Sequence, residues 1–182
     1  MTNVDKIAQG WHGRALRCES PNYNARTCDD ISLLVIHNIS LPPGEYGDGC
    51  VQAFFANALD CDSHPAFDEL RDMQVSAHFL IERDGQLTQF VSTDERAWHA
   101  GVSSFAGREN CNDFSIGIEL EGSDSEAYTD AQYKQLAALT QDIMQCYPAI
   151  TVDRIVGHAD IAPGRKTDPG PAFDWTRYRA SL

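Results

Sequence analysis

Residues 32–38 (SLLVIHN) constrain the fold more than any other segment, because they are apolar on both faces of an extended chain. A short continuous apolar run rich in β-branched residues is typical of a central strand that is covered on both sides. Helices must then pack on both faces of the sheet to which this strand belongs. The segment therefore predicts an α/β fold.

Further segments have the pattern of strands. Residues 77–82 and 87–91 flank an Asp-Gly pair, which is a strong hairpin signal because a type I′ turn needs residues with positive φ. Residues 114–121 alternate, with Phe, Ile, Ile and Leu on one face and Ser, Gly, Glu and Glu on the other. We interpret residues 154–158 as a short last strand.

Helical patterns lie between and after these strands. Residues 51–59 predict a helix, and Thr129 followed by Gln132 fits a capping box that begins a longer one, which a proline ends. Residues 174–179 predict a terminal helix, whereas residues 1–30 read as an irregular lead-in segment packed on the domain. We expect one α/β domain over all 182 residues, with a single mixed sheet flanked by helices.

The charge balance limits the partners. Lys and Arg number 14 against 27 Asp and Glu, so the formal net charge is −13. This argues against nucleic acid, whose binders present a basic face, and against docking on an anionic membrane. No apolar run approaches the ~18 residues of a spanning helix. We expect a monomer without nucleic-acid or membrane partners, although local Arg and Lys can bind a small anionic ligand.

The six cysteines form no C-x-x-C pair. Residues 1–6 lack the basic segment and following apolar run of a secretory signal. Disulfides are rare in the cytosol, so we expect a cytoplasmic protein with reduced thiols.

Two of the six histidines stand at matching places. His37 lies at the carboxyl end of the predicted central strand, and His158 ends the last strand. Asp168 follows ten residues after His158. Two imidazoles and one carboxylate, with a fourth position open to water, form a hydrolytic zinc site. The alternative is that each histidine is a packing or capping residue, since no local pattern shows that the two meet.

Two glutamates could supply acid–base chemistry. Glu119 and Glu121 lie on the polar face of segment 114–121, and Gly117 shares that face, so another group can approach the backbone closely. A carboxylate beside a zinc-bound water serves as general base and then as acid. A solvated strand face is the alternative interpretation, and the spacing does not choose between the two glutamates.

Two loops carry other candidates. Lys166 sits between Pro163 and Pro169, and such a rigid loop would aim the ammonium at an oxygen polarised by the metal, although loop lysines are usually only solvated. Trp98 and His99 could bind a sugar or a peptide, unless the tryptophan is simply buried at a strand end. Residues 38–44 directly follow His37 and could form the rim of the site.

The chain resembles the zinc-dependent N-acetylmuramoyl-L-alanine amidases of bacterial cell-wall recycling, which are related in fold to peptidoglycan recognition proteins and phage-type amidases. The resemblance covers about residues 20–179 and is most specific in segments 32–43, 75–79, 96–103, 112–122, 128–132 and 161–175. It implies a mixed, mainly five-stranded sheet flanked by helices. It also implies one zinc ion held by His37, His158 and Asp168, with Glu119 rather than Glu121 as the catalytic carboxylate and Lys166 as the oxyanion stabiliser.

The resemblance further implies a substrate. The enzyme would cleave the amide between the lactyl group of 1,6-anhydro-N-acetylmuramic acid and the L-alanine of the stem peptide. Asn38, Trp98 and His99 would line the cleft. Relatives often carry Glu in place of Gly164, and some carry arginine near positions 74 and 110, where this chain has Gln and Asn; Arg71 and Arg108 are the expected substitutes. The alternatives are a non-catalytic domain that binds cell-wall fragments, which would lack a metal ligand, and a broader periplasmic amidase, which would need a signal.

Overall fold

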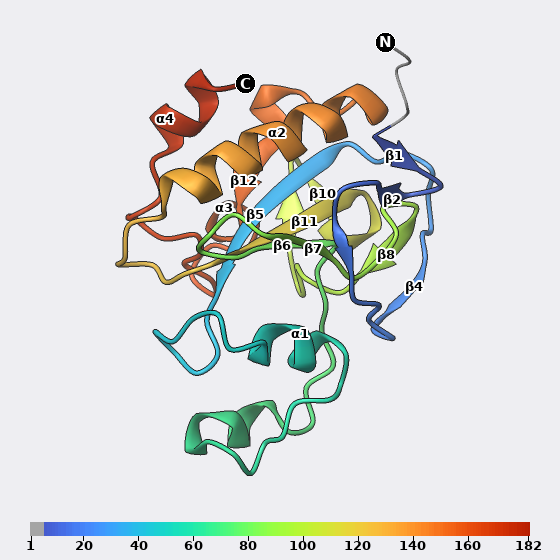
Figure 1. Ribbon diagram of the computed structural model, residues 1–182. Helices are drawn as coiled ribbons and strands as arrows, with labels where there is room; N and C mark the ends of the chain where they lie inside the picture. Colours follow the sequence, from blue (N-terminus) through green and yellow to red (C-terminus); the bar gives the residue numbers. More distant parts are fainter. Residues whose placement is uncertain (1–5) are drawn as a thin grey trace.

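A six-stranded mixed sheet forms the centre of the computed structural model, which describes residues 6–182 (Figure 1). The interpretation of the chain's start as lacking a signal depends on residues 1–5, which lie outside the described residues. The strands follow the order β12 (Ile155–Gly157), β5 (Leu33–Ile39), β11 (Ser115–Glu121), β6 (Phe79–Ile81), β7 (Leu87–Gln89) and β3 (Leu16–Arg17). The first four are parallel, β7 runs antiparallel to β6, and β3 is parallel to β7. The expected α/β class with a single main mixed sheet is confirmed.

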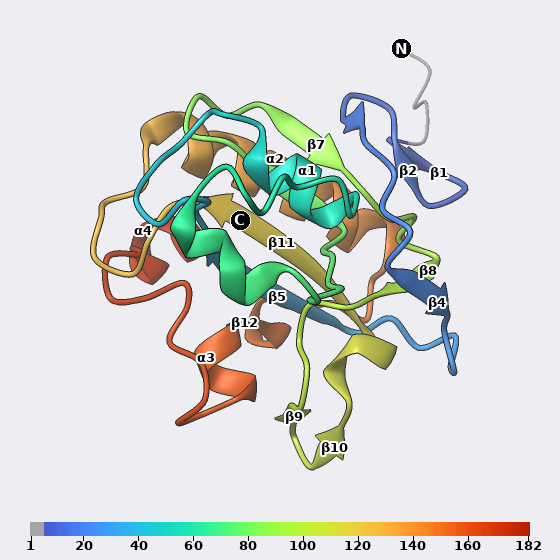
Figure 2. The same cartoon turned by 90° about the horizontal axis from the view of Figure 1, so that it is seen from below.

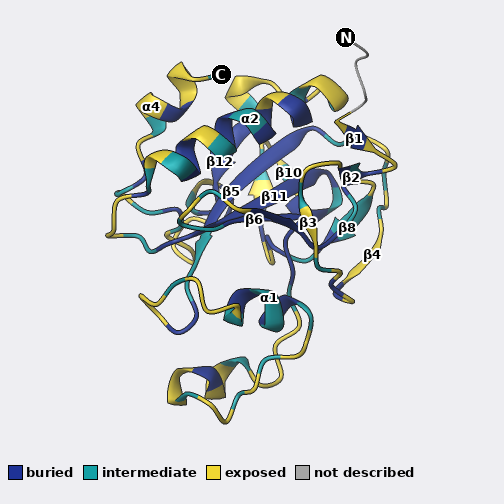
Figure 3. Cartoon of the chain, viewed as in Figure 1, coloured by how far each residue is buried: buried dark blue, intermediate teal, exposed yellow. Residues whose placement is uncertain are grey.

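Strands β5 and β11 lie side by side inside the sheet, and both are largely buried (Figure 3). Each has a parallel neighbour on both sides, and β11 is buried along its whole length, including its polar residues. The polar face of β11 is therefore covered by protein instead of being solvated. In the register of this pair Glu119 stands opposite His37, so both side chains emerge on one face near the carboxyl end of the sheet.

Helix α2 (Asp130–Cys146) covers the other face of the sheet (Figure 1). It begins at the expected capping box, in which the Thr129 side chain accepts from Gln132 N and the Gln132 side chain accepts from Thr129 N. Its apolar stripe packs with the inward residues of β5, β6 and β11 and with Tyr178 of α4 (Trp175–Ala180) in one core cluster. Burial of this stripe holds the helix in place, because most of the stability of a helix within a protein comes from the packing of its apolar face.

The face that carries His37 and Glu119 is covered by shorter elements. Helix α1 (Cys50–Phe55) and the 3₁₀ segment η1 (Pro65–Leu70) cross over it on the side opposite α2 (Figure 2). Helix α3 (His158–Ile161) directly follows β12. Short 3₁₀ turns η2 (Cys111–Asp113) and η3 (Val152–Arg154) precede β11 and β12. These short elements leave the carboxyl ends of the central strands near the surface.

The predicted hairpin between β6 and β7 is confirmed, but the prediction that a type I′ turn connects the two strands is wrong. Gly85 is the one turn residue with a positive φ, at 89°. Its N–H donates to Glu82 O, and Glu82 N–H donates to Gln86 O. These bonds define a three-residue loop with glycine in the left-handed region, which needs one residue of positive φ where a type I′ turn needs two.

Two other expectations differ from the structure. The lead-in segment contains four short strands, β1 (Ile7–Ala8), β2 (Trp11–His12), β3 and β4 (Tyr23–Ala25). β1 pairs with β2, β4 pairs with β8 (Glu95–Ala97), and β3 adds a sixth strand to the sheet where five were expected. Strands of two or three residues are too short to show an alternating pattern. Helix α1 stops at Phe55, before Asn57, whose φ is 56°.

No helix among residues 6–182 has the length and apolar character needed to cross a membrane. All six cysteines lie in this part of the chain, and no disulfide joins any of them. A further small hairpin, β9 (Ser104–Phe105) with β10 (Arg108–Glu109), projects from the loop between β8 and η2 (Figure 2).

Candidate metal centre and active site

His37, His158 and Asp168 converge at the carboxyl ends of β5 and β12. The distances between His37 Nδ1, His158 Nδ1 and Asp168 Oδ2 are 3.0 Å for the two nitrogens and 3.1 Å from each nitrogen to the oxygen. The strand register explains why the two histidines are close. Gly157 pairs with Ile36 in adjacent parallel strands, so the residues that follow them, His158 and His37, lie at the same height along the sheet. Residues far apart in the sequence thus form one cluster of three ligand-type side chains.

The hydrogen bonds around the two imidazoles fit a cation between them. His158 Nε2 lies 3.1 Å from Ala100 O, a group that can only accept, so the proton of this ring is on Nε2. His37 Nε2 lies 2.9 Å from His99 Nδ1. With both outer nitrogens donating, the two Nδ1 atoms and Asp168 Oδ2 are three electron-pair donors that point at one another. A divalent cation stabilises such an arrangement, and this donor set is typical of catalytic zinc.

The protonation states also suit metal binding. Burial lowers the pKa of His37 to about 4. Burial acts to raise the pKa of Asp168, but the adjacent imidazoles of His158 and His37 outweigh it and hold that pKa well below its usual range. Near neutral pH the cluster therefore contains a neutral His37 and an ionised Asp168, which are the forms that bind a metal ion.

His99 supports this cluster from behind. Its ring packs on Gly117, where a Cβ atom would come within 2.5 Å of His99 Cγ. The prediction that a group approaches the backbone at Gly117 is thus confirmed, and the group is the His99 imidazole. His99 Nε2 lies 3.2 Å from Ser115 Oγ, and the residue is buried. The sequence places His99 among the residues that line the substrate cleft, because it follows a tryptophan in a loop. In the structure its ring is buried against Gly117, and a glycine two residues before Glu119 is the sequence feature that permits this close approach.

Glu119 and Glu121 have different surroundings. Glu119 is buried, and its Oε2 has no hydrogen-bond partner among residues 6–182. Burial, aided by the charge of Asp168, raises its pKa well above the usual value, while Lys166 acts in the opposite direction. In Glu121, Oε1 accepts from Gly47 N at 2.6 Å and Oε2 accepts from Arg83 N at 3.1 Å. Glu121 therefore fastens two loops, whereas Glu119 keeps a free carboxylate oxygen.

The loop after α3 carries Lys166, whose side chain is exposed. Its positive charge acts to lower the pKa of both Glu119 and His37, but burial is the larger influence on each. The preceding residue, Arg165, donates from one guanidinium nitrogen to Ala100 O at 2.6 Å and to Val102 O at 2.7 Å. The loop that holds Lys166 is therefore tied to the loop that backs the two histidines.

The other predicted substrate-binding residues lie around this centre with partners of their own. Asn38 follows His37 and donates to Asp124 Oδ1 at 2.8 Å. Trp98 is partly exposed and donates from Nε1 to Asn24 Oδ1 at 2.6 Å. Both remain predicted contacts, since each keeps exposed surface, Asn38 next to His37 and Trp98 next to His99 in the chain.

The two predicted arginines are engaged with protein groups. Arg108, in β10, pairs with Asp30 at 2.8 Å, and its guanidinium carbon lies 3.9 Å from the centre of the Phe114 ring. Arg71 is exposed and pairs with Asp62 and Asp68. A substrate carboxylate would have to displace these acidic partners in order to bind either arginine.

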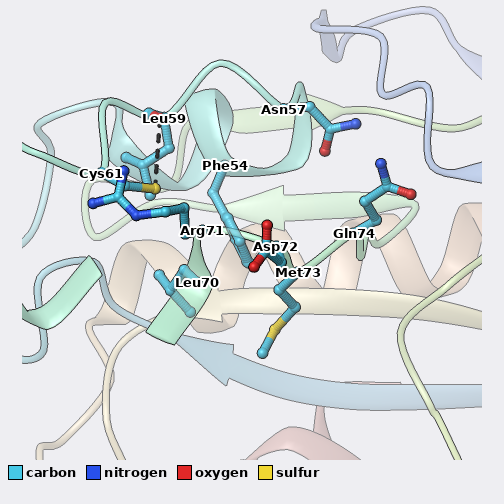
Figure 4. Close-up of a pocket in the computed structure, with 9 residues that line it drawn as sticks. All are labelled: Phe54, Asn57, Leu59, Cys61, Leu70, Arg71, Asp72, Met73 and Gln74. Atoms are coloured by element: carbon cyan, nitrogen blue, oxygen red, sulfur yellow. Dashed lines mark hydrogen bonds between the residues drawn. The ribbon is translucent and has the colours of Figure 1, made fainter. Parts of the chain in front are cut away.

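Arg71 lines a pocket beside α1 and η1, where it and Cys61 lie at one end and Asn57 and Gln74 at the other (Figure 4). None of the residues that line this pocket belongs to the cluster of His37, His158 and Asp168. The pocket is thus separate from the candidate metal centre, and its polar ends are already hydrogen-bonded in part to the protein.

The profile of the N-acetylmuramoyl-L-alanine amidase family matches residues 27–171. The 1,6-anhydro-N-acetylmuramyl-L-alanine amidase AmpD of Salmonella typhimurium is 60% identical over 173 residues, which is 94% of this chain and 92% of that protein. AmpD of Haemophilus influenzae is 55% identical over 183 residues and covers 100% of both chains.

Solved structures give the same relationship. The chain resembles the crystal structure of a selenomethionine AmpD derivative with a TM-score of 0.94 and 56% identity, over 97% of this chain and 98% of that one. It resembles Escherichia coli AmiD with a TM-score of 0.61 and 35% identity, over 83% of this chain and 57% of that one. AmiD is in complex with the substrate anhydro-N-acetylmuramic acid-L-Ala-D-γ-Glu-L-Lys.

Proposed function

The chain belongs to the N-acetylmuramoyl-L-alanine amidase family, and we propose that it is a zinc-dependent amidase that hydrolyses the lactyl–L-alanine amide of 1,6-anhydro-muropeptides. The observation that carries this proposal is the convergence of His37, His158 and Asp168 beside a buried Glu119 with an unpartnered oxygen. The name of the AmpD relatives and the ligand of the AmiD structure support the choice of substrate.

His37 Nδ1, His158 Nδ1 and Asp168 Oδ2 would hold the zinc ion. When bound, zinc lowers the pKa of water toward ~7 and polarises a carbonyl oxygen. The protein holds the two imidazoles in the required tautomers through His99 and Ala100, and it keeps Asp168 ionised. These features favour a pre-formed site, because the three ligand atoms already lie about one hydrogen-bond length apart.

Glu119 would move the protons of the reaction. Its free oxygen can accept a proton from the attacking water and return it to the leaving amine. Burial raises its pKa, which brings the carboxyl closer to the pH at which it must both accept and donate. Because Glu119 is buried, bulk water has little access to its carboxyl group, and its proton is exchanged with the reacting groups.

Lys166 would stabilise the negative charge that develops on the carbonyl oxygen, because a positioned ammonium is most useful where charge appears along the reaction path. Asn38 and Trp98 would contact the sugar or the first residues of the stem peptide. Arg71 and Arg108 would take part in recognising stem carboxylates once their acidic partners are displaced.

The enzyme would act as a single-domain monomer in the cytoplasm, within the recycling of peptidoglycan. The match to AmpD over nearly the full length of both chains supports this assignment.

Metal analysis combined with mass spectrometry of digested muropeptides tests the proposal. We expect about one zinc per chain, release of 1,6-anhydro-N-acetylmuramic acid and the free stem peptide, and complete loss of cleavage after chelation, with recovery when zinc is added. A chain that binds the muropeptide but neither holds zinc nor cleaves the amide would be the non-catalytic recognition domain. Equal cleavage of muropeptides with a reducing sugar end would indicate the broader amidase.

A further inference from the structure

We propose that Asn112 is a positioning residue for the metal centre, which acts on both histidine ligands at once through the adjacent residues His99 and Ala100. The inference rests on the proposed function, because it requires that His37 and His158 bind a metal ion. Among the described residues, Asn112 forms no hydrogen bond with any of the three candidate ligands, so its effect on them is indirect.

The first step concerns the outer nitrogens of the two ligands. His37 Nε2 is hydrogen-bonded to the ring of His99, and His158 Nε2 donates to the carbonyl of Ala100. Partners of this kind fix the tautomer and the orientation of a metal-bound imidazole. Here the partners are two consecutive residues of one loop, so any displacement of that loop moves both supports together.

The second step concerns what holds the loop. Asn112 Oδ1 accepts from His99 N at 3.1 Å and from Ala100 N at 2.8 Å. Asn112 and both donors are buried, so water cannot readily replace the amide oxygen if it is removed. The backbone carbonyl of Asn112 in turn accepts from the guanidinium of Arg26 at 3.2 Å. A single side-chain oxygen therefore holds the backbone N–H groups of both residues that support the ligands, while Arg165 separately donates to the Ala100 carbonyl.

The third step concerns the ring of His99. Since His37 presents Nδ1 to the centre, its Nε2 carries the proton and donates to His99 Nδ1. The proton of His99 is then on Nε2, which donates to Ser115 Oγ. Gly117 beneath the ring leaves room for it in this position only because it lacks a Cβ atom. Once the backbone of His99 is held, His37, Ser115 and Gly117 therefore fix the orientation and the tautomer of its ring.

The test compares three variants in the full chain. Asn112→Ala removes the shared acceptor, and Asn112→Asp keeps an oxygen there. Asn22→Ala is the matched control, because Asn22 is a buried asparagine that joins other loops by donating to Val75 O at 2.8 Å and Asn57 Oδ1 at 2.7 Å. For each protein we would measure the zinc dissociation constant by competition with a chelator, the visible spectrum of the cobalt(II) form, and the melting temperature without metal.

We expect Asn112→Ala to bind zinc about 10–100-fold more weakly than the wild type, the range typical for loss of a group that supports a ligand. Its cobalt(II) spectrum should change, because the ligand geometry changes. Asn112→Asp should recover most of the affinity and the wild-type spectrum. Asn22→Ala should lower the melting temperature and leave zinc affinity and the cobalt(II) spectrum unchanged.

Wild-type zinc affinity and cobalt(II) spectrum in Asn112→Ala, with a melting temperature as low as that of the control, would overturn the inference. If Asn112→Ala does not fold, Asn112→Ser takes its place under the same criteria. A wild-type protein that binds no zinc at all would instead remove the proposed function, and this inference with it.

Discussion

Two buried clusters of histidine and aspartate in this molecule have opposite organisation. In the first, which we call the triad, His37, His158 and Asp168 have side chains that are 1%, 5% and 13% exposed. In the second, which we call the Asp142 cluster, His12, Lys6 and Arg14 surround Asp142, and the His12 and Asp142 side chains are 0% and 1% exposed. Burial alone therefore does not distinguish a site from a structural contact.

The number of donors and acceptors does distinguish them. One Asp142 oxygen accepts from Lys6 Nζ, and the other lies 3.1 Å from both His12 Nε2 and Arg14 Nη2. This carboxylate is fully satisfied by cationic or N–H groups, and it fastens strand β2 of the lead-in segment to α2. The triad instead turns two imidazole lone pairs and a carboxylate toward one point, beside Glu119 with an unpartnered oxygen. Converging acceptors mark a place that a cation completes.

Removal of a triad member should have the largest effect. We expect His37→Ala, His158→Ala and Asp168→Ala each to lose zinc and to fall to the activity of the chelated wild type, because a site with three protein ligands cannot spare one. Metal analysis and muropeptide digestion measure both effects. His12→Ala is the control from the Asp142 cluster and should keep its zinc. Full zinc occupancy in all three triad variants would show that the ion binds elsewhere.

The second prediction separates catalysis from metal binding. Glu119→Ala should keep zinc and fold but lose the proton-transfer contribution, about 10²–10⁴-fold in kcat. Glu121→Ala leaves Gly47 N and Arg83 N without their acceptor, so it should cost stability, about 1–3 kcal/mol, with a much smaller effect on kcat. Kinetics, metal content and denaturation of both variants decide the matter. An active Glu119→Ala beside an inactive, zinc-retaining Glu121→Ala would reverse the two assignments.

The third prediction concerns Lys166. Lys166→Ala should keep zinc and lose about 10²–10³-fold, the effect of removing one oxyanion donor. The loss should appear in kcat more than in KM, because the charge develops only along the reaction path. Lys134→Ala, which removes an exposed lysine from α2, is the matched control and should retain full activity. Equal kinetics for the two variants would mean that Lys166 is only a solvated lysine.

Much of the central fold follows from local patterns. The apolar run of β5, the alternation of β11 and the capping box of α2 are properties of a few neighbouring residues, and each was predictable from them. The edge strand β3 was not, because its two residues pair with β7 through contacts that depend on the tertiary structure. Gly85 has the positive φ expected of a turn glycine, but the turn is a three-residue loop and not a two-residue one, since sequence alone does not fix the number of loop residues.

In the candidate site, too, some features follow from the local sequence and others depend on tertiary contacts. The matching positions of His37 and His158 near strand ends were visible in the sequence, but the parallel pairing of β5 and β12 that brings them to one edge was not. The difference between Glu119 and Glu121 was not visible, because it depends on Gly47 and Arg83 in other loops. The position of His99 depends likewise on a glycine in another strand. Spacing can place a side chain on a face, but its hydrogen-bond partners come from distant segments.

The smallest effect is expected in the Asp142 cluster, from Asp142→Asn. Zinc content and activity should be unchanged. At pH 7 the free energy of unfolding should fall by about 1–2 kcal/mol, because hydrogen bonds to a charged group are lost but the Lys6 and Arg14 partners are exposed and contribute little. Chemical denaturation of wild type and variant measures the difference.

The pH dependence of that difference identifies its origin. Burial acts to raise the pKa of Asp142, but hydrogen bonds from Lys6 and His12 outweigh it, so the pKa lies below its usual value. Such a carboxylate stabilises the fold above its unfolded pKa of about 3.9, and the stabilisation is lost as the pH falls through the lower folded value. The gap in stability between wild type and Asp142→Asn should therefore be full at pH 7 and should close below about pH 4. A gap that stays constant into this acidic range would mean that Asp142 acts through its shape and packing, and the contrast with the triad would then not depend on charge.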